Sequence, residues 1–326
     1  MNGQVKVTRP KEYSQSPLGQ DSVKFGGPEY FAVPSYGGVE PHTKFAVVRP
    51  GAGTVLACVV IPWLMFSGVC YVNESSSRYY DGMVYAAVDG CFVMVALGFG
   101  VIAFQAMRKR QRGDLSQDPT WLTYICVMSL VGIAGGCICG QMNYVSYWRP
   151  YFDNKSLGTY RNVDAGADTG TMVMDAGTIH FTSDTYLDLT KAMGFTDSDT
   201  YCVAPITSPS NDGKRYDFWA VGLNCCTSGS NPNFECGEYN NPAAHSALRV
   251  LDDEEREFFR LAEQQAEVTY NIGALQPLFF TFMEYPQDEL LRYYSDGVKY
   301  LILSVSGALA FMIVITAAFF VTWVRF

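Results

Sequence analysis

Four of the ten cysteines of this chain lie in one long polar stretch of the sequence, where they are placed to form disulfides. They are Cys202, Cys225, Cys226 and Cys236. A bond between the adjacent Cys225 and Cys226 would force a strained geometry, so each is expected to pair with Cys202 or Cys236, in either of two connectivities. No Cys-x-x-Cys pair is present and the nearest histidine, His245, is isolated, which argues against a metal site. The sequence predicts no cofactor.

The carboxylate of Asp89 is a second group that could do chemistry, because it lies within the apolar segment 83–107. A carboxylate inside a bilayer is costly unless it is paired, hydrated or protonated. Gln141 and Asn143 lie at comparable depth in a later apolar segment, so we expect these three residues to be intramembrane polar side chains. Pairing among the helices is the preferred interpretation. The alternatives are handling of a proton or cation and a carboxylate that is merely solvated at the interface.

Other patterns that could indicate an enzyme fail on their context. Asp168-Thr169-Gly170 matches the signature of aspartic proteases, but it follows a Gly/Ala/Asp-rich turn where that signature needs an apolar strand. His180 and His245 are not accompanied by a serine in a nucleophile-elbow pattern. The sequence contains no phosphate-binding loop or zinc-helix motif. We therefore expect a protein that is not an enzyme, and the sequence identifies no small-molecule substrate.

The apolar residues are concentrated in four blocks, each near the length that crosses a bilayer as a helix. The blocks cover residues 54–72, 83–107, 121–145 and 298–324. Pro62 falls in the first block, and a membrane helix tolerates such a proline when neighbouring groups satisfy the freed carbonyl. The sequence thus predicts an α-helical membrane protein with four transmembrane helices.

The segments between the blocks differ strongly in composition. Residues 1–53 are rich in Gly, Pro, Ser and Tyr and predict a disordered tail. A short loop is expected at 73–82, a basic loop at 108–120 and a two-residue end at 325–326. Residues 146–297, between the third and fourth helices, are long enough to form a domain with its own core.

Charge gives an orientation to the four helices. The tail and the loop 108–120 are net basic, whereas residues 144–297 hold ten basic and 23 acidic residues, a net charge of −13. Positive residues beside spans mark the cytosolic face, so both termini are predicted to be cytosolic and the large domain extracellular or lumenal. The sequons at Asn73 and Asn154 fall on the predicted outer side, so glycosylation is expected there. The expected location is the plasma membrane or a membrane of the secretory pathway.

The large domain combines strand and helix patterns. Strands are expected at Tyr201–Ile206 and Tyr216–Leu223, and a hairpin is expected from Thr171–Met174 and Thr178–Phe181 around an Asp-Ala-Gly turn. Pro277–Met283 is either a buried strand or a segment on the membrane surface, and burial is favoured. The acidic composition makes binding to nucleic acid improbable.

The segment Asp252–Ile272 has the periodicity of an amphipathic helix, with Gly273 as its expected stop. The residues predicted to share its buried face are Phe258, Leu261, Ala262, Val268 and Ile272. This helix is expected to lie on the sheet, which makes the domain an α+β, disulfide-stabilised one.

Three glycines of the third block recur every four residues and so fall on one helix face. They are Gly132, Gly136 and Gly140. Missing side chains let another helix approach closely, so these glycines are predicted to be helix-packing residues. The approaching helix belongs either to this chain, which is favoured, or to another protein.

Four spans with inside termini, a short first outer loop and a large disulfide-bearing second one resemble the layout of tetraspanins, and Cys225-Cys226 is similar to the cysteine pair of that family's large loop. Here Thr227 follows the pair, where tetraspanins have glycine. The resemblance implies a lateral organiser of membrane proteins. We therefore expect a non-enzymatic multi-pass protein that presents an acidic, disulfide-bonded ectodomain for recognition or complex assembly, with other membrane proteins or with itself. The alternative is a subunit of an ion channel or transporter that uses Asp89.

Overall fold

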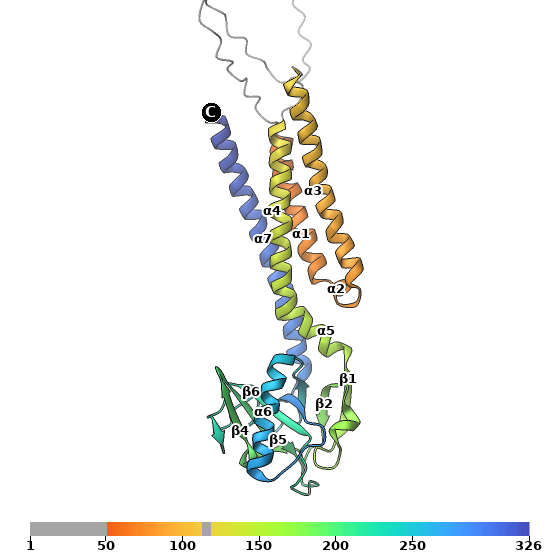
Figure 1. Cartoon of the computed structure of the whole chain (residues 1–326), viewed down its shortest axis with the longest axis vertical. Helices are drawn as coiled ribbons and strands as arrows, with labels where there is room; N and C mark the ends of the chain where they lie inside the picture. Colours follow the sequence, from red (N-terminus) through yellow and green to blue (C-terminus); the bar gives the residue numbers. More distant parts are fainter. Residues whose placement is uncertain (1–50, 113–118, 326) are drawn as a thin grey trace, which may run out of the picture. The chain divides into compact units, whose positions relative to one another are not determined.

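The computed structural model describes residues 51–112 and 119–325 of the chain (Figure 1). The predicted disordered tail lies outside the described residues except for its last three, 51–53. Residues 113–118 of the predicted basic loop and Phe326 also lie outside them.

Four stretches of helix are long and apolar enough to cross a membrane, in agreement with the predicted four-pass layout. They are α1 (Ala52–Glu74), α3 (Gly82–Gln111), α4 (Pro119–Asn143) with its continuation to Ser156, and α7 (Pro286–Arg325). The continuation of α4 consists of a π-helical turn, Tyr144–Trp148, and α5 (Arg149–Ser156). A short helix, α2 (Ser76–Tyr80), connects α1 to α3.

Aromatic contacts join α4 and its continuation to α7 in two places. Near the start of α4, the ring of Trp121 lies edge-on to Phe319, with 5.6 Å between ring centroids. Trp148, in the π-helical turn, lies 5.5 Å from Tyr294 of α7. These contacts join the third and fourth candidate spans at two places, near the start of α4 and in its continuation.

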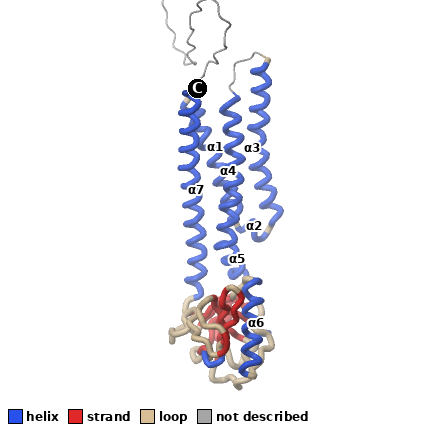
Figure 2. Tube along the Cα trace, turned by 60° about the vertical axis from the view of Figure 1, so that its left-hand side comes forward, coloured by secondary structure: helices blue, strands red, loops and turns tan. Residues whose placement is uncertain are grey.

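All strands of the described chain lie between α5 and α7, in a unit called here the inserted domain (residues 157–285; Figure 2). The strands are β1 (Gly158–Val163), β2 (Ala176–Phe181), β3 (Tyr186–Leu187), β4 (Met193–Asp197), β5 (Asp199–Thr207), β6 (Phe218–Leu223), β7 (Gly229–Ser230), β8 (Ser246–Arg249) and β9 (Leu278–Met283). Their order in the sheet is β1-β2-β8-β9-β6-β5-β4-β7, with β3 paired to β5. The pairs β1–β2 and β6–β9 are parallel and the other pairs are antiparallel.

The sheet is buried on both faces, because alternate side chains of its central strands enter different clusters. Trp219 of β6 and Phe279 of β9 pack against Phe259 of α6 (Asp253–Tyr270) on one face. Phe218 and Phe280, their neighbours along the same strands, pack on the opposite face against loop residues. The run Pro277–Met283 therefore forms a central strand, β9, and the prediction of its burial is correct.

The amphipathic helix α6 forms where it is expected, and its predicted face is buried only in part: Ala262 is buried, and Phe258 and Ile272 are partly buried against the same cluster. Its buried apolar residues are Phe259, Ala262 and Ala266. Leu261 and Val268, which were predicted to be buried, are 43% and 85% exposed. The helix stops at Asn271 and not at Gly273, because Asn271 takes the left-handed conformation (φ 54°) that closes the last turn.

The predicted hairpin at residues 171–181 is wrong. Gly170–Val173 is a 3-10 turn, and β2 pairs in parallel with β1 and in antiparallel with β8. The buried carboxylate of Asp217 explains the turn, since it accepts a hydrogen bond from the backbone N–H of Gly170 (3.0 Å) and another from that of Leu275 (2.7 Å). Asp217 thereby holds the segment before β2 against the segment before β9.

Candidate functional site

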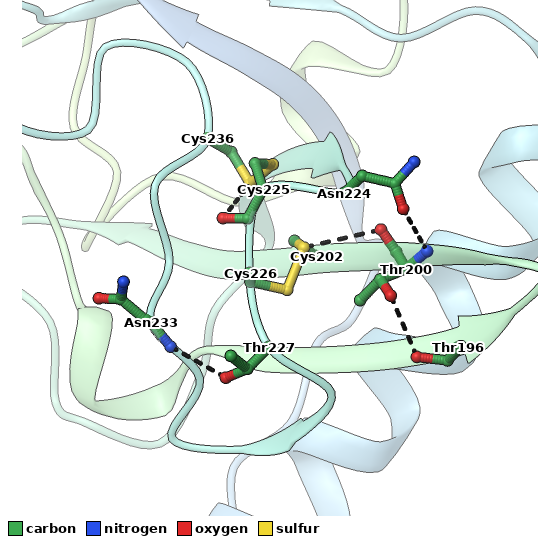
Figure 3. Close-up of a disulfide and its surroundings, with 9 residues drawn as sticks. All are labelled: Thr196, Thr200, Cys202, Asn224, Cys225, Cys226, Thr227, Asn233 and Cys236. Atoms are coloured by element: carbon green, nitrogen blue, oxygen red, sulfur yellow. Dashed lines mark hydrogen bonds between the residues drawn. A yellow bond between two sulfur atoms is a disulfide. The ribbon is translucent and has the colours of Figure 1, made fainter.

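The four cysteines of the inserted domain form two disulfides, Cys202–Cys226 and Cys225–Cys236, which decides between the two connectivities left open by the sequence (Figure 3). Cys202 belongs to the central strand β5, so the first bond ties the segment after β6 to the middle of the sheet. The Sγ atoms of Cys202, Cys225 and Cys236 lie within 4.8 Å of one another, but each is in a disulfide and offers no thiolate to a metal. The two disulfides therefore stabilise the fold of the inserted domain.

The three glycines of α4 face α1. A Cβ added at Gly132 would lie 2.8 Å from the carbonyl oxygen of Pro62, and one at Gly136 would lie 2.7 Å from that of Phe66. At Gly140 the Cβ would lie 2.6 Å from the Cβ of Asn73. The backbones of α1 and α4 are therefore close along this face, and the partner helix belongs to the same chain.

Asp89 lies in a polar cluster formed by α1, α2 and α3. Its Oδ2 accepts a hydrogen bond from Nδ2 of Asn73 (3.1 Å), and Oδ1 of Asn73 accepts one from the hydroxyl of Tyr85 (3.1 Å). Arg78 donates to the same Asn73 oxygen and also to Gln141 of α4. The direct partner of Asp89 is thus Asn73, whereas Gln141 joins the cluster through Arg78.

Glu74 is a buried carboxylate that the sequence reading missed, because Asn73-Glu74-Ser75 was interpreted as a sequon in a loop. Glu74 is 3% exposed at the end of α1; its Oε1 accepts a hydrogen bond from the thiol of Cys70 (3.2 Å), and Oε2 has no partner among the described residues. Asn143 is fully buried and donates to the carbonyl of Gly297 in α7 (3.0 Å), while its Oδ1 has no described partner either. Within the described residues, Glu74 forms no ion pair.

Both sequon asparagines are buried in the helical part of the chain. Nδ2 of Asn73 donates to the carbonyl of Val69 (2.9 Å) as well as to Asp89, and Nδ2 of Asn154 donates to the carbonyl of Pro150 (3.0 Å). A glycan on either nitrogen would displace these contacts. Glycosylation at the two sites stays a prediction, and their packing weighs against it.

His180 and the Asp-Thr-Gly motif have structural contacts. Nδ1 of His180 lies 2.8 Å from the hydroxyl of Ser246 across the β2–β8 pair, and burial lowers the pKa of His180. Ser246 is itself buried, so its hydroxyl is not presented to a substrate. Oδ2 of Asp168 accepts a hydrogen bond from the backbone N–H of Asp164 (2.8 Å), which closes the loop after β1.

A groove with a volume of about 540 Å³ runs between α6 and the β4–β7 edge of the sheet. Its residues are Met193, Phe195, Gly229, Ser230, Leu261, Gln264, Gln265, Val268 and Thr269. β7 pairs only with Met193 and Gly194, so the outer edge of β4 at Phe195–Asp197 has no strand partner among the described residues. An exposed edge beside an apolar groove is a surface on which another polypeptide can dock.

Carboxylates surround the end of this groove at the β4–β5 turn. Phe195, Phe258 and Tyr201 form a stack there, with ring centroids 6.4 Å and 4.7 Å apart. Burial, together with the nearby charge of Asp199, raises the pKa of Tyr201. Asp197 and Asp199 are exposed in the turn itself. The groove therefore ends in a negatively charged aromatic surface, which favours a cationic neighbour.

None of the known protein families matches this chain, and no similarity to a curated protein or to a solved structure was found. The four apolar helices are consistent with a four-pass layout, and no family match supports membership of the tetraspanins.

Proposed function

We propose that this chain is a non-enzymatic, multi-pass membrane protein whose inserted domain recognises another protein and so assembles a membrane complex. The exposed apolar side chains of α6 carry this proposal. Leu261 and Val268 stand beside the groove on a helix whose other face is fixed to a disulfide-stapled sheet. Apolar side chains exposed on a rigid surface and bordering a groove are typical of a binding site.

The partner is proposed to be a protein segment that is basic and carries an apolar anchor. The anchor would enter the groove beside Leu261 and Val268, and the basic residues would lie next to the acidic turn at Asp197 and Asp199. The net charge of −13 on residues 144–297 favours the same choice of partner, because it attracts cationic surfaces over a distance. Other membrane proteins and a second copy of this chain are both candidates for the source of the segment.

Charged variants of the groove test this function. Leu261→Asp and Val268→Asp place a carboxylate at exposed positions, so folding is expected to be retained. The variants lose the apolar contact with the partner, which weakens the binding free energy by roughly 1.5–3 kcal/mol for each aliphatic side chain that the partner would bury. The matched control is Met172→Asp, at a residue that is 67% exposed and outside the groove. Native electrophoresis of mild-detergent extracts is expected to show a smaller complex for the groove variants only. Identical complexes for all three variants would refute a role for the groove.

We further propose that the inserted domain faces the outside or a lumen, with both termini in the cytosol, in the plasma membrane or the secretory pathway. The acidic charge of the domain and its two disulfides support this orientation. Protease added to sealed vesicles from the outer face is expected to cut the inserted domain and to spare the loop 108–120. Cleavage of that loop with protection of the domain would show that the true orientation is the opposite of the proposed one.

A second candidate function is that of a channel or transporter subunit that uses Asp89. The observation in its favour is that Oδ1 of Asp89 and Oε2 of Glu74 are buried and have no hydrogen-bond partner among the described residues. Two such carboxylate oxygens in apolar helices are suited to bind a proton or a cation. Asp89→Asn and Glu74→Gln, measured in proteoliposomes, should abolish flux under this function and change only stability or assembly under the first.

A further inference from the structure

The inserted domain has a second cleft, of about 530 Å³, formed between the first half of α6 and the strands β8 and β9. Its residues are Arg249, Asp253, Arg256, Glu257, Arg260, Gln276, Pro277 and Phe279. Only ten Lys and Arg residues occur in the whole of segment 144–297, and three of them line this one cleft. Basic residues are thus concentrated at this cleft, although the segment as a whole is acidic.

The guanidinium of Arg249 is held in place by backbone carbonyls and forms no ion pair among the described residues. Its Nη1 donates to the backbone carbonyls of Met174 (2.9 Å) and Ala176 (3.4 Å), which fixes the plane of the group at the wall of the cleft. Asp175 attracts Arg249 electrostatically, but its carboxylate accepts a hydrogen bond from the hydroxyl of Tyr160 (2.7 Å) and forms no ion pair with the arginine. Burial and the neighbouring charge of Arg256 lower the pKa of Arg249. A positioned, partly desolvated guanidinium that forms no ion pair within the described part of the chain is suited to receive an anion.

Arg256 and Arg260 are one turn apart on α6 and both reach the same cleft. Arg256 forms an ion pair with Asp253 (2.9 Å), whereas Arg260 is exposed and forms no ion pair among the described residues. Two guanidinium groups with free donors, Arg249 and Arg260, therefore face the cleft with a third nearby. Guanidinium groups match the oxygens of tetrahedral oxyanions through pairs of parallel hydrogen bonds.

We propose that this cleft binds a sulfate or phosphate ester, with Arg249 and Arg260 as the direct ligands of the oxyanion. The volume exceeds what one oxyanion fills, and Pro277 and Phe279 provide an apolar wall for the organic part that carries it. Glu257 also lines the cleft and opposes an anion, so it limits the affinity. The site is separate from the groove of the proposed function, since none of the residues that line the cleft lines the groove.

The test uses the full-length protein in nanodiscs at low salt, titrated calorimetrically with three probes. These are a sulfated oligosaccharide, a sugar phosphate, and inorganic sulfate or phosphate. Saturable binding of either ester that is tighter than binding of the inorganic ions is expected. Equal affinity for the esters and the inorganic ions would mean that the site binds a free oxyanion, and the proposal that it recognises an ester would be refuted. No saturable binding of any probe overturns the site itself.

Paired variants identify the ligands. Arg260→Gln is at an exposed residue and should weaken ester binding about tenfold or more, since a charge-assisted hydrogen bond is lost. Arg161→Gln makes the same charge change at an exposed residue outside the cleft and should leave affinity within about twofold. Equal losses from both variants would mean that the ligand senses only net charge, and the cleft would be excluded.

A variant that gains affinity gives an independent check, because misfolding cannot increase ester binding. Glu257→Gln removes the opposing carboxylate and is expected to strengthen ester binding severalfold. Glu254→Gln, at an exposed residue of the same helix outside the cleft, is the matched control and should have a smaller effect. A Glu257→Gln protein that binds no better than the control would contradict the placement of the anion in this cleft.

Discussion

Adding a single methyl group at Gly136 should destabilise the helix pair α1–α4. A Cβ at this position would lie 2.7 Å from the carbonyl oxygen of Phe66 and 3.2 Å from the Cβ of Val69. The nearer atom belongs to the backbone of α1, so it cannot rotate away, and the two helices must separate. Overpacking of this kind costs roughly 1–3 kcal/mol. Because the contact lies within one chain, Gly136→Ala should lower the stability of the monomer.

Gly98→Ala is the matched control, because Gly98 lies in another membrane helix, α3, and a Cβ there would meet no atom within 4 Å. Alanine is up to about 1 kcal/mol more favourable than glycine inside a helix, so this variant should be as stable as the original protein or more stable. The two substitutions are therefore predicted to shift stability in opposite directions. Reversible unfolding of the purified protein in detergent, followed by tryptophan fluorescence, measures both. Equal stabilities for the two variants would refute the close approach of α1 and α4.

Two further predictions concern the inserted domain. Glu263 is 2% exposed on α6, and its burial, with the charge of Glu267 nearby, raises its pKa from 4.5 to about 8. The folded state therefore holds this proton more tightly than the unfolded state. The stability that Glu263 contributes should be fully present below pH 4.5 and should fall by at most about 1.4 kcal/mol per pH unit as the pH rises towards 8. Glu263→Gln should flatten this dependence and raise the melting temperature above pH 8; an unchanged profile would mean that Glu263 is charged in the folded protein. For the disulfides, the double variant Cys225→Ser with Cys236→Ser should retain the Cys202–Cys226 bond in a non-reducing peptide map and lose roughly 2–5 kcal/mol of stability. A new bond between Cys202 and another cysteine would show that the assigned pairing is incorrect.

Hydropathy was sufficient to find the four apolar helices, because length and apolar content alone decide whether a helix can cross a bilayer. The run Pro277–Met283 could also be assigned, since a strand buried on both faces is apolar without alternation. The disulfide partners could be narrowed to two connectivities by the adjacency of Cys225 and Cys226, but the choice depends on where β5 and the loop after β6 meet in space.

Two features could not be derived from the sequence because they depend on tertiary contacts. The buried face of α6 is set by Trp219 and Phe279 of the sheet, which accept Phe259 and leave Leu261 and Val268 exposed. A helix periodicity with apolar residues on more than one face does not reveal which face packs. This ambiguity hid the groove that carries the proposed function.

The second feature is the burial of Asn73 and Glu74. It follows from the close approach at Gly140, where α4 lies against the end of α1. A sequon is a three-residue pattern and carries no information on such packing. The direct partner of Asp89 was missed for the same reason.

Photo-crosslinking in native membranes tests the central claim most directly. A photo-reactive amino acid at Val268, which is 85% exposed beside the groove, should yield a discrete crosslinked product with a second protein. That product should decrease at high salt and when Asp197 and Asp199 are replaced by asparagine, because a basic partner is attracted by these carboxylates. The same amino acid at Met172 should yield no such product. Identical products from both positions, or a product from Val268 that is unaffected by salt and by the two replacements, would contradict recognition of a basic partner at the groove.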